Sequence, residues 1–446
     1  MNAIAADLAS RCLELHGRRL PPAVSTEAER SLLNVVATAI GASRQPAVDI
    51  VIEVGKRVGG PPVHVIPGRG ERADRHHAAL ATGVAAHIDD YDDTHLRTVI
   101  HPGAACLAAG LVTATDRRSS GRQFMSAFAV GIEAQLRVGV AMSPHHYDEG
   151  WHITGTVGAI GAAVTAGLLA GLDAHRLGMA VALAASQPLG HRESFGTMEK
   201  SFHPGKAVAT GLFAALLAEQ GVETAIDVLE GEGGYFELLS GESRHGEVLA
   251  EMGTHWEILA NTYKPYPCGI VCHPPIDAAI ALSGWVRDTA RVRRVTIHCN
   301  PLVAELTGNP APTDGLEARF STIHGVAAGL ADGRVGLLQY GDQRVLSIDL
   351  VRLRSVTSLA PDPAIPRDAA RVAVELDDGH RMEESISHAR GSLERPLTDA
   401  ELLEKTRGLV EPVLPGRTAA VVEAVRGAGV SETIDPLLAA VSGERR

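Results

Sequence analysis

Residues 154–172, TGTVGAIGAAVTAGLLAGL, form the longest apolar stretch of the chain. Its length is close to that of a membrane-spanning helix. However, the stretch is built largely from glycine and alanine, and no cluster of basic residues flanks it. Small side chains let neighbouring helices approach closely. We therefore expect a buried core helix in a mainly helical protein, and no membrane segment.

Segments rich in alanine and glycine with a helical pattern extend over most of the first 264 residues. Apolar residues recur at helical spacing in residues 77–87, 103–115 and 204–219, which indicates helices that bury one face. Glycine-rich joints, such as EGEGGY at 230–235, separate these segments. The sequence therefore predicts a large all-helical domain over residues 1–264.

The sequence pattern changes from helical to strand-like near residue 290. RVRRVTIHCN (291–300) and QRVLSIDLVRLRSVT (343–357) are rich in β-branched residues, and both are predicted to be strands. ARVAVELDDGHRMEESI (370–386) is predicted to be a hairpin with an Asp-Asp-Gly turn. FSTIHGVAAGLADG (320–333) indicates a helix that ends at Gly333.

We therefore expect a smaller α+β domain over residues 265–396, which would form a lid on the helical body. Residues 397–446 return to a helical pattern, and they are expected to pack back on the first domain and complete it. The predicted fold class is mainly α with an α+β part. A cleft between two such domains is a common ligand site.

Composition excludes some classes of protein. The chain has 446 residues, 45% hydrophobic and 21% charged, with a formal net charge of -12. A nucleic-acid partner would need a basic face, and no run of Lys/Arg interleaved with aromatic residues occurs. The spacing of Cys268 and Cys272, with three residues between them, is not that of a zinc knuckle. We expect a cytoplasmic protein with reduced thiols.

Residues 87–103, HIDDYDDTHLRTVIHPG, contain three histidines and four aspartates. A metal site, an acid/base site and a solvated acidic loop are all possible. His87, Asp90, Asp92 and His95 could face one ion, but their spacing matches no known metal motif, and the chain contains no HExxH sequence. The interpretation as a metal site is therefore weakened.

The dipeptide His-Pro occurs three times, at 101–102, 203–204 and 273–274, and a helical pattern follows each time. Proline is favoured at the first position of a helix. Each histidine is therefore predicted to lie where a helix begins, close to exposed N–H groups that attract carboxylates. The alternative is that His-Pro is an ordinary helix start.

Two further polar clusters accompany these histidines. HHYDEGWHITGTVG (145–158) brings Tyr147 and His152 to the start of the long Gly/Ala helix, and FGTMEKSFHPGK (195–206) contains Lys200 and His203 three residues apart. Lysine supplies a compact cation, and histidine can titrate near neutral pH. Together, the clusters suggest carboxylate binding and proton transfer.

The clusters, in this order, resemble those of the MmgE/PrpD family, which includes 2-methylcitrate dehydratase, cis-aconitate decarboxylase and iminodisuccinate epimerase. The matching blocks are His87-x-x-Asp90-Tyr91-Asp92-Asp93-Thr94 with His101-Pro102, Gly131-Ile132-Glu133, Gly150-Trp151-His152, Phe195-Gly196-Thr197-Met198-x-Lys200-x-x-His203, Lys264-Pro265-Tyr266-Pro267-Cys268 with His273, and Gly391, Pro396-Leu397 and Lys405. The resemblance implies a helical domain with an α+β lid, a site between them, small di- or tricarboxylate substrates, a homodimer, and no metal, flavin or nucleotide.

The resemblance also implies roles for individual residues. The catalytic residues would be Asp90, His101, Tyr147, His152 and Lys200, and the substrate-binding residues would be Thr94, His203, Lys264 and His273. His101 and His152 would share the acid/base chemistry, with Lys200 as a carboxylate clamp. Asp90 would orient an imidazole, and Tyr147 matches a tyrosine implicated in the epimerase branch.

The chain departs from the family pattern at a few positions. Gly269 and Leu306 stand where the decarboxylase branch has a histidine and, nearby, a tyrosine, which argues against a cis-aconitate decarboxylase. Glu199 replaces a common threonine, and Ser201 a common proline. The predicted function is a cofactor-independent lyase of the 2-methylcitrate dehydratase type. The alternatives are an epimerase of a small dicarboxylate and a non-catalytic carboxylate-binding protein.

Overall fold

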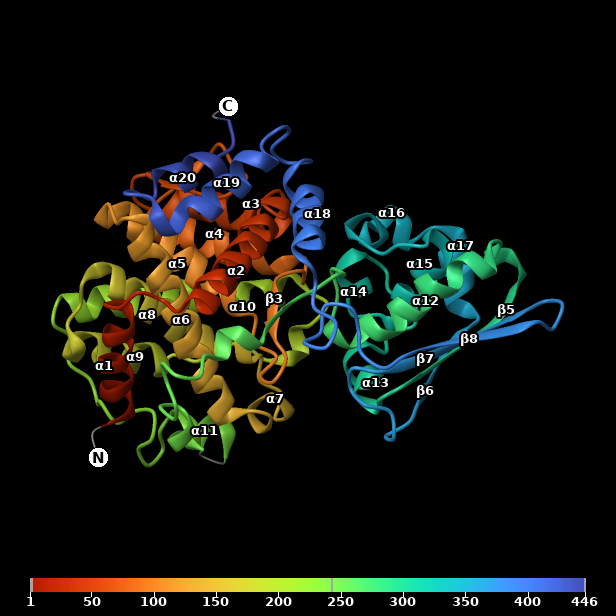
Figure 1. Ribbon diagram of the computed structural model, residues 1–446, viewed down its shortest axis with the longest axis horizontal. Helices are drawn as coiled ribbons and strands as arrows, with labels where there is room; N and C mark the ends of the chain where they lie inside the picture. The colour runs from red at the N-terminus through yellow and green to blue at the C-terminus, as the bar shows by residue number, and fades with distance from the viewer. Residues whose placement is uncertain (1–2, 242–243, 445–446) are drawn as a thin grey trace.

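The stretch 154–172 forms helix α8 (Ile153–Ala170), which lies in the middle of a helical body (Figure 1). Every residue of α8 except Ala170 is buried, because other helices pack around it. A Cβ atom added to Gly211 would lie 2.2 Å from the carbonyl oxygen of Ala159. Helix α10 (Met198–Glu219) can therefore approach α8 this closely only because residue 211 is a glycine.

The computed structural model describes residues 3–241 and 244–444. It confirms the predicted fold class, with a large helical body beside a smaller α+β part (Figure 1). The other helices of the body are α1 (Ile4–His16), α2 (Pro22–Gly41), α3 (Pro46–Val58), α4 (Arg75–Ile88), α5 (Pro102–Arg117), α6 (Gly121–Met142), α7 (His145–Asp148), α9 (Ala174–Ala185), α11 (Tyr235–Ser240), α18 (Asp399–Val410), α19 (Thr418–Gly427) and α20 (Asp435–Val441).

The C-terminal helices share the core of the body. Both α18 and α19 pack against α2. Buried residues between Leu397 and Val441 belong to the same hydrophobic core as those between Ile4 and Tyr263. Two short pairs of strands also belong to the body: β1 (His64–Val65) with β2 (Arg72–Ala73), and β3 (Asp93–His95) with β4 (Asn261–Tyr263).

Among the residues that the structure describes, two single helices, α6 and α8, are long and apolar enough to span a membrane by length and composition, and the pair α2 and α3, bent by 80°, passes the same test only if taken as one span. The apolar segments of α6 and α8 are 100% and 94% buried inside the protein. In this fold both are core helices, as expected for residues 154–172.

The α+β part has a hydrophobic core of its own. Its four-stranded sheet has the order β6-β5-β7-β8, formed by β5 (Val292–Cys299), β6 (Thr357–Pro361), β7 (Ala370–Leu376) and β8 (Arg381–Ile386). β5 pairs parallel with β6 and antiparallel with β7, and the hairpin β7–β8 confirms the predicted Asp-Asp-Gly turn. The helices are α12 (His273–Val286), α13 (Pro301–Thr307), α14 (Gly315–Ala318), α15 (Thr322–Asp332), α16 (Asp342–Val345) and α17 (Ile348–Ser355).

The strand predicted over 343–357 is wrong for most of its length. The segment forms α16 and α17, and only its last residue, Thr357, begins strand β6. Leu350, Leu353 and Arg354 are buried on one side of α17. Their spacing of three and four residues is helical, and it outweighs the β-branched residues on which the prediction rested.

The prediction for the three His-Pro pairs holds for two of them. His101 is the N-cap of α5, and His273 is the first residue of α12. The prediction for His203 is wrong, because α10 begins at Met198 and both His203 and Pro204 lie inside it. Proline has no N–H to donate to the carbonyl four residues earlier. The carbonyl of Lys200 therefore loses its usual helical hydrogen bond.

Candidate active site

Four helix ends meet in the body, on the side that faces the α+β part. His87 lies in the last turn of α4, and Lys200 lies in the first turn of α10. His101 and His152 are the N-caps of α5 and α8. The predicted clusters are thus brought together by the packing of these helices, although more than a hundred residues separate His87 from Lys200.

The short sheet β3–β4 adds a second lysine. Asp93 lies opposite Tyr263 in this antiparallel pair, so that Lys264 follows β4 directly beside residues 90–92. Asp90 has a backbone φ of 49°, in the left-handed region that aspartate tolerates better than most residues. This turn directs the Asp90 carboxylate toward both lysines.

The two lysines hold the Asp90 carboxylate. Its Oδ1 atom lies 2.7 Å from Nζ of Lys200 and 3.0 Å from Nζ of Lys264. Burial alone would raise the pKa of Asp90, but the two ammonium groups outweigh burial and hold this pKa well below its usual value. Burial lowers the pKa of Lys200, against the attraction of Asp90. A carboxylate of a substrate could contact the same ammonium groups.

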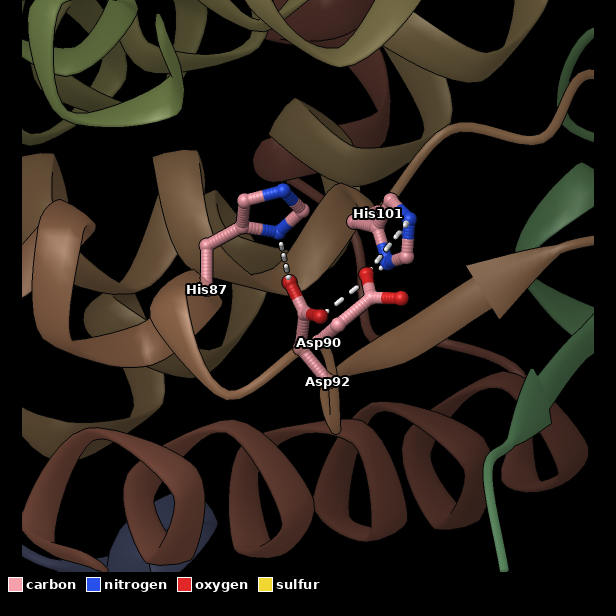
Figure 2. Close-up of side chains that lie close together, drawn as sticks. All are labelled: His87, Asp90, Asp92 and His101. Carbon is pink, nitrogen blue, oxygen red and sulfur yellow. Dashed lines mark hydrogen bonds and ion pairs between the residues drawn. The ribbon is translucent and has the colours of Figure 1, made fainter. Parts of the chain in front are cut away.

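Asp92 links two histidines (Figure 2). Its Oδ2 atom accepts a hydrogen bond from Nδ1 of His87 at 2.8 Å, and its Oδ1 atom lies 3.1 Å from Nδ1 of His101. Burial would raise the pKa of Asp92, but His101 and His87 hold it well below its usual value. The hydrogen bond to Asp92 places hydrogen on Nδ1 of His87. The Asp92 carboxylate beside Nδ1 of His101 favours hydrogen on that atom as well, and Nε2 of a neutral His101 then bears the lone pair.

Burial keeps the site histidines neutral. It lowers the pKa of His101, with Asp92 opposing, and it lowers the pKa of His87 to about 4. The pKa of His152 is held well below its usual value by burial and then by Lys200. A neutral imidazole is a suitable proton acceptor near pH 7. Acid/base chemistry is therefore within reach of this cluster.

A cavity of about 120 Å³ lies between the body and the α+β part. From the body it is lined by Asp90, Thr94, Leu96, Arg97, Thr98, Val99, His101, Ser143, Pro144, Tyr147, Asp148, His152, Phe195, Lys200 and Lys264. From the α+β part it is lined by Gly269, Ile270, Val271, Leu302, Leu306, Thr307, Phe320 and Arg367. The first set is rich in groups that bind anions or move protons, and the second is mostly apolar.

Seven of the nine candidate residues line this cavity: Asp90, Thr94, His101, Tyr147, His152, Lys200 and Lys264. The other two, His203 and His273, are buried but do not line it. His203 lies behind His152, and the ring of His273 packs against Tyr266 at 5.5 Å. Thr94 Oγ1 lies 3.3 Å from Nδ1 of His101 and helps to fix that ring.

Tyr147 adds a neutral phenol to the wall. The guanidinium of Arg192 lies 4.8 Å from the centre of its ring. Burial raises the pKa of Tyr147 to about 12, although Arg192 opposes this. The phenol therefore keeps its proton at neutral pH and can act as a hydrogen-bond donor.

Four side chains that carry an imidazole or a carboxylate lie close enough together to hold one metal ion: His87, Asp90, Asp92 and His101 (Figure 2). His95 is not among them, because its ring faces Thr98 and Glu257. Nζ of Lys200 lies 2.8 Å from Nε2 of His87, and with Lys264 it already neutralises Asp90. A divalent cation would be repelled by these ammonium groups, so the residues fit a metal poorly.

The sequence did not indicate Phe195, Phe320 or Arg367 as site residues. Both aromatic rings lie near Nζ of Lys200, at 5.3 and 5.4 Å. Arg367 lies on the loop between β6 and β7, and it forms no ion pair with any residue that the structure describes. Asp368 anchors this loop, since it lies 2.6 Å from Nδ1 of His388. Phe195 stands in the quoted block 195–206 without a role assigned to it. No local pattern marks Phe320 or Arg367, because they reach the cavity only through tertiary packing.

Family models and known proteins both match this chain. The family model described as the MmgE/PrpD N-terminal domain matches residues 6–247, and that of the MmgE/PrpD C-terminal domain matches residues 266–427. The chain is similar to cis-aconitate decarboxylase of Mus musculus, at 27% identity over 76% of this chain and 72% of the relative. It is also similar to cis-aconitate decarboxylase of Homo sapiens, at 27% identity over 76% of this chain and 73% of the relative. A third relative is cis-aconitate decarboxylase of Aspergillus terreus, at 26% identity over 94% of this chain and 92% of the relative.

Proposed function

The chain belongs to the MmgE/PrpD family, and on that basis we propose that it is a lyase that acts on a small polycarboxylate. The finer proposal is a cofactor-independent dehydratase of the 2-methylcitrate dehydratase type. It would remove a proton next to a carboxylate of a hydroxy acid, with loss of water. The observation that carries the proposal is one cavity lined by two ammonium groups and two neutral imidazoles.

The roles follow from the charges in the cavity. Lys200 and Lys264 would bind the carboxylate and stabilise the negative charge that develops on it when the neighbouring C–H bond breaks. Nε2 of His152 or His101 would accept the proton, because both imidazoles are kept neutral by burial. The other histidine, or the Tyr147 phenol, would donate a proton to the leaving hydroxyl.

Two positions in the cavity wall favour water loss over decarboxylation. Gly269 and Leu306 line the cavity, and neither carries a group that could protonate the carbanion left after loss of carbon dioxide. The resemblance implies a histidine and a tyrosine near these positions in the decarboxylase branch, and this chain has neither. This difference supports a lyase reaction that releases water and not carbon dioxide.

An epimerase of a small dicarboxylate is the second candidate. It is supported by Tyr147, whose protonated phenol lines the same cavity as His101 and His152. Two groups on different sides of a substrate carbon could remove and return one proton. Such an enzyme would exchange the substrate's α-hydrogen for solvent deuterium without forming a new double bond.

A substrate panel tests the proposal. Purified protein is incubated with 2-methylcitrate, citrate, cis-aconitate and related hydroxy acids, and the absorbance of a conjugated carboxylate, carbon dioxide release and deuterium uptake are measured in parallel. A rise in absorbance with hydroxy acids supports the dehydratase. Carbon dioxide release from cis-aconitate would overturn water loss in favour of decarboxylation, and deuterium uptake alone would favour the epimerase. Thermal stabilisation by these acids without turnover would indicate a non-catalytic binding protein.

A further inference from the structure

A chain of three side chains runs from the cavity to the protein surface behind His152. Nδ1 of His152 lies 3.0 Å from Nδ1 of His203. On the other side of the His203 ring, Nε2 lies 3.6 Å from Oε1 of Glu199. The Glu199 side chain is 56% exposed, whereas that of His203 is 1% exposed. The three residues therefore connect a buried imidazole to solvent.

The His203 ring is tightly enclosed by two glycines. A Cβ atom at Gly190 would lie 2.7 Å from both Cγ and Nδ1 of His203, and one at Gly155 would lie 2.9 Å from its Cβ. Gly190 also has a φ of +106°, which other residues rarely adopt. Because the backbone closes around the ring at both positions, His203 is held with Nδ1 toward His152 and Nε2 toward Glu199.

The contacts of the two rings indicate which nitrogen atoms carry hydrogen. Nε2 of His203 faces the Glu199 carboxylate at 3.6 Å, an ion-pair distance, and a negative charge there favours hydrogen on Nε2 of a neutral His203. Nδ1 of His203 is then an acceptor, and Nδ1 of His152 must be the donor. This leaves a lone pair on Nε2 of His152, which forms no hydrogen bond within residues 3–241 and 244–444.

We propose that Glu199, His203 and His152 form a proton relay between the cavity and solvent. The relay rests on the proposed function, because it gives the base of that reaction a route for its proton. Glu199 and His203 do not line the cavity, so they are positioning and relay residues, whereas His152 would contact the substrate.

Each transfer in the relay is balanced. The substrate C–H bond breaks as an N–H bond forms at Nε2 of His152, and the Nδ1 hydrogen of His152 moves to Nδ1 of His203. The Nε2 hydrogen of His203 moves to the Glu199 carboxylate, which releases a proton to water. The same steps in reverse take up a proton from water at Glu199, restore hydrogen on Nε2 of His203 and on Nδ1 of His152, and deliver the Nε2 hydrogen of His152 to a carbanion or a leaving hydroxyl.

The first test needs no substrate. Protein labelled with ¹⁵N at histidine is examined by NMR at neutral pH, and the signals of His152 and His203 are assigned from His152→Ala and His203→Asn. We expect hydrogen on Nδ1 of His152 and on Nε2 of His203. Hydrogen on Nε2 of His152 would overturn the relay, because the lone pair would then face away from the cavity.

The second test uses Glu199→Gln, whose amide has the same size and can face His203 but cannot take up its proton. Turnover is measured with the acid of the above panel that is converted fastest. We expect a decrease of about tenfold or more at low buffer concentration, and recovery as the imidazole buffer is raised at constant pH and ionic strength. A residue that only stabilises the fold would show no such dependence on buffer.

Glu193→Gln is the matched control, because Glu193 is an exposed carboxylate in the neighbouring 3₁₀ helix Arg192–Ser194. It should behave as the wild-type protein does. If Glu199→Gln also keeps full turnover in dilute buffer while His152→Ala is inactive, the relay is wrong and the proposed function stands. If the wild-type protein converts no acid of the panel, the proposed function fails, and the NMR test still decides the hydrogen positions.

Discussion

The carboxylate of Asp92 lies 3.1 Å from Nδ1 of His101, and both side chains are buried. Asp92 also accepts a hydrogen bond from His87, so that one carboxylate orients two imidazoles. A buried carboxylate that binds Nδ1 fixes the tautomer and the direction of the other ring nitrogen. Nε2 of a neutral His101 is then the nitrogen that can accept a proton, and it lies 3.9 Å from Oδ1 of Asp90 in the cavity wall.

Replacing this carboxylate should therefore reduce activity more than stability. In Asp92→Asn the amide can bind only one of the two rings in the same way, and His101 is free to adopt the wrong tautomer. We expect kcat to fall by about 10²–10⁴-fold, measured with the acid selected by the panel. Unchanged kcat with a folded variant would show that Asp92 does not orient the base.

Removing Lys200 tests the carboxylate clamp. In Lys200→Ala, Asp90 keeps Lys264 as a partner at 3.0 Å, so the fold should survive. Loss of one cation that stabilises developing charge should lower kcat/KM by about 10²–10³-fold. Steady-state kinetics and thermal unfolding are measured side by side. Activity near that of the wild-type protein would contradict the assignment of Lys200.

Arg367 is expected to bind the distal carboxylate of the substrate. It lines the cavity and has no ion-pair partner in the described part of the chain. Loss of one charge-assisted hydrogen bond of about 1.5–3 kcal/mol should raise KM roughly 10- to 100-fold in Arg367→Gln, with little change in kcat.

The control for this variant is Arg371→Gln, because Arg371 lies on β7 and pairs at the surface with Glu383. Its KM should equal that of the wild-type protein. Equal KM values for both variants would show that Arg367 does not bind the substrate.

The activity should persist to acidic pH. Burial lowers the pKa values of His101 and His152, so both imidazoles stay neutral below the ordinary value of 6.5 and become protonated only at a lower pH. The acid limb of kcat/KM should therefore lie below pH 6.5. Asp92 raises the pKa of His101, so any residual activity of Asp92→Asn should have its acid limb at still lower pH. A limb above pH 6.5 would contradict these neutral imidazoles.

Acid should also destabilise the fold. Burial lowers the pKa of His146 to about 4, so between pH 6.5 and 4 the unfolded chain binds a proton that the folded chain does not. The free energy of unfolding therefore falls as the pH is lowered through this window, by about 3 kcal/mol for this residue at pH 4.

His146→Asn should reduce this dependence, because an amide can still donate to the carbonyl of Leu239, which Nδ1 of His146 contacts at 2.6 Å. Denaturant unfolding at pH 7 and pH 5 measures the difference between the variant and the wild-type protein. An identical slope for both would show that His146 does not contribute.

Periodicity predicted most of the architecture. The Gly/Ala composition of residues 154–172 correctly predicted a buried helix, and the Asp-Asp-Gly turn predicted the β7–β8 hairpin. The errors arose where two local signals competed. In residues 343–357 the β-branched residues suggested a strand, but the three- and four-residue spacing of the buried side chains produced helices. At Pro204, a helix that was already established by Thr197 as N-cap continued through a proline.

The sequence by itself determined which residue types are available for chemistry, because histidine, lysine and aspartate appear in clusters that local order alone makes visible. Only the tertiary structure decided which of these residues line the cavity and which lie behind it. Asp92 lies between His87 and His101, His203 lies behind His152, and the cavity receives its second wall from the α+β part. Lys405, in α18, donates hydrogen bonds to the carbonyls of Tyr91 and Lys264 and so ties the C-terminal helices to the site. The physical reason is that distances between side chains depend on how helices separated by many residues pack, and no local pattern in the sequence encodes those distances.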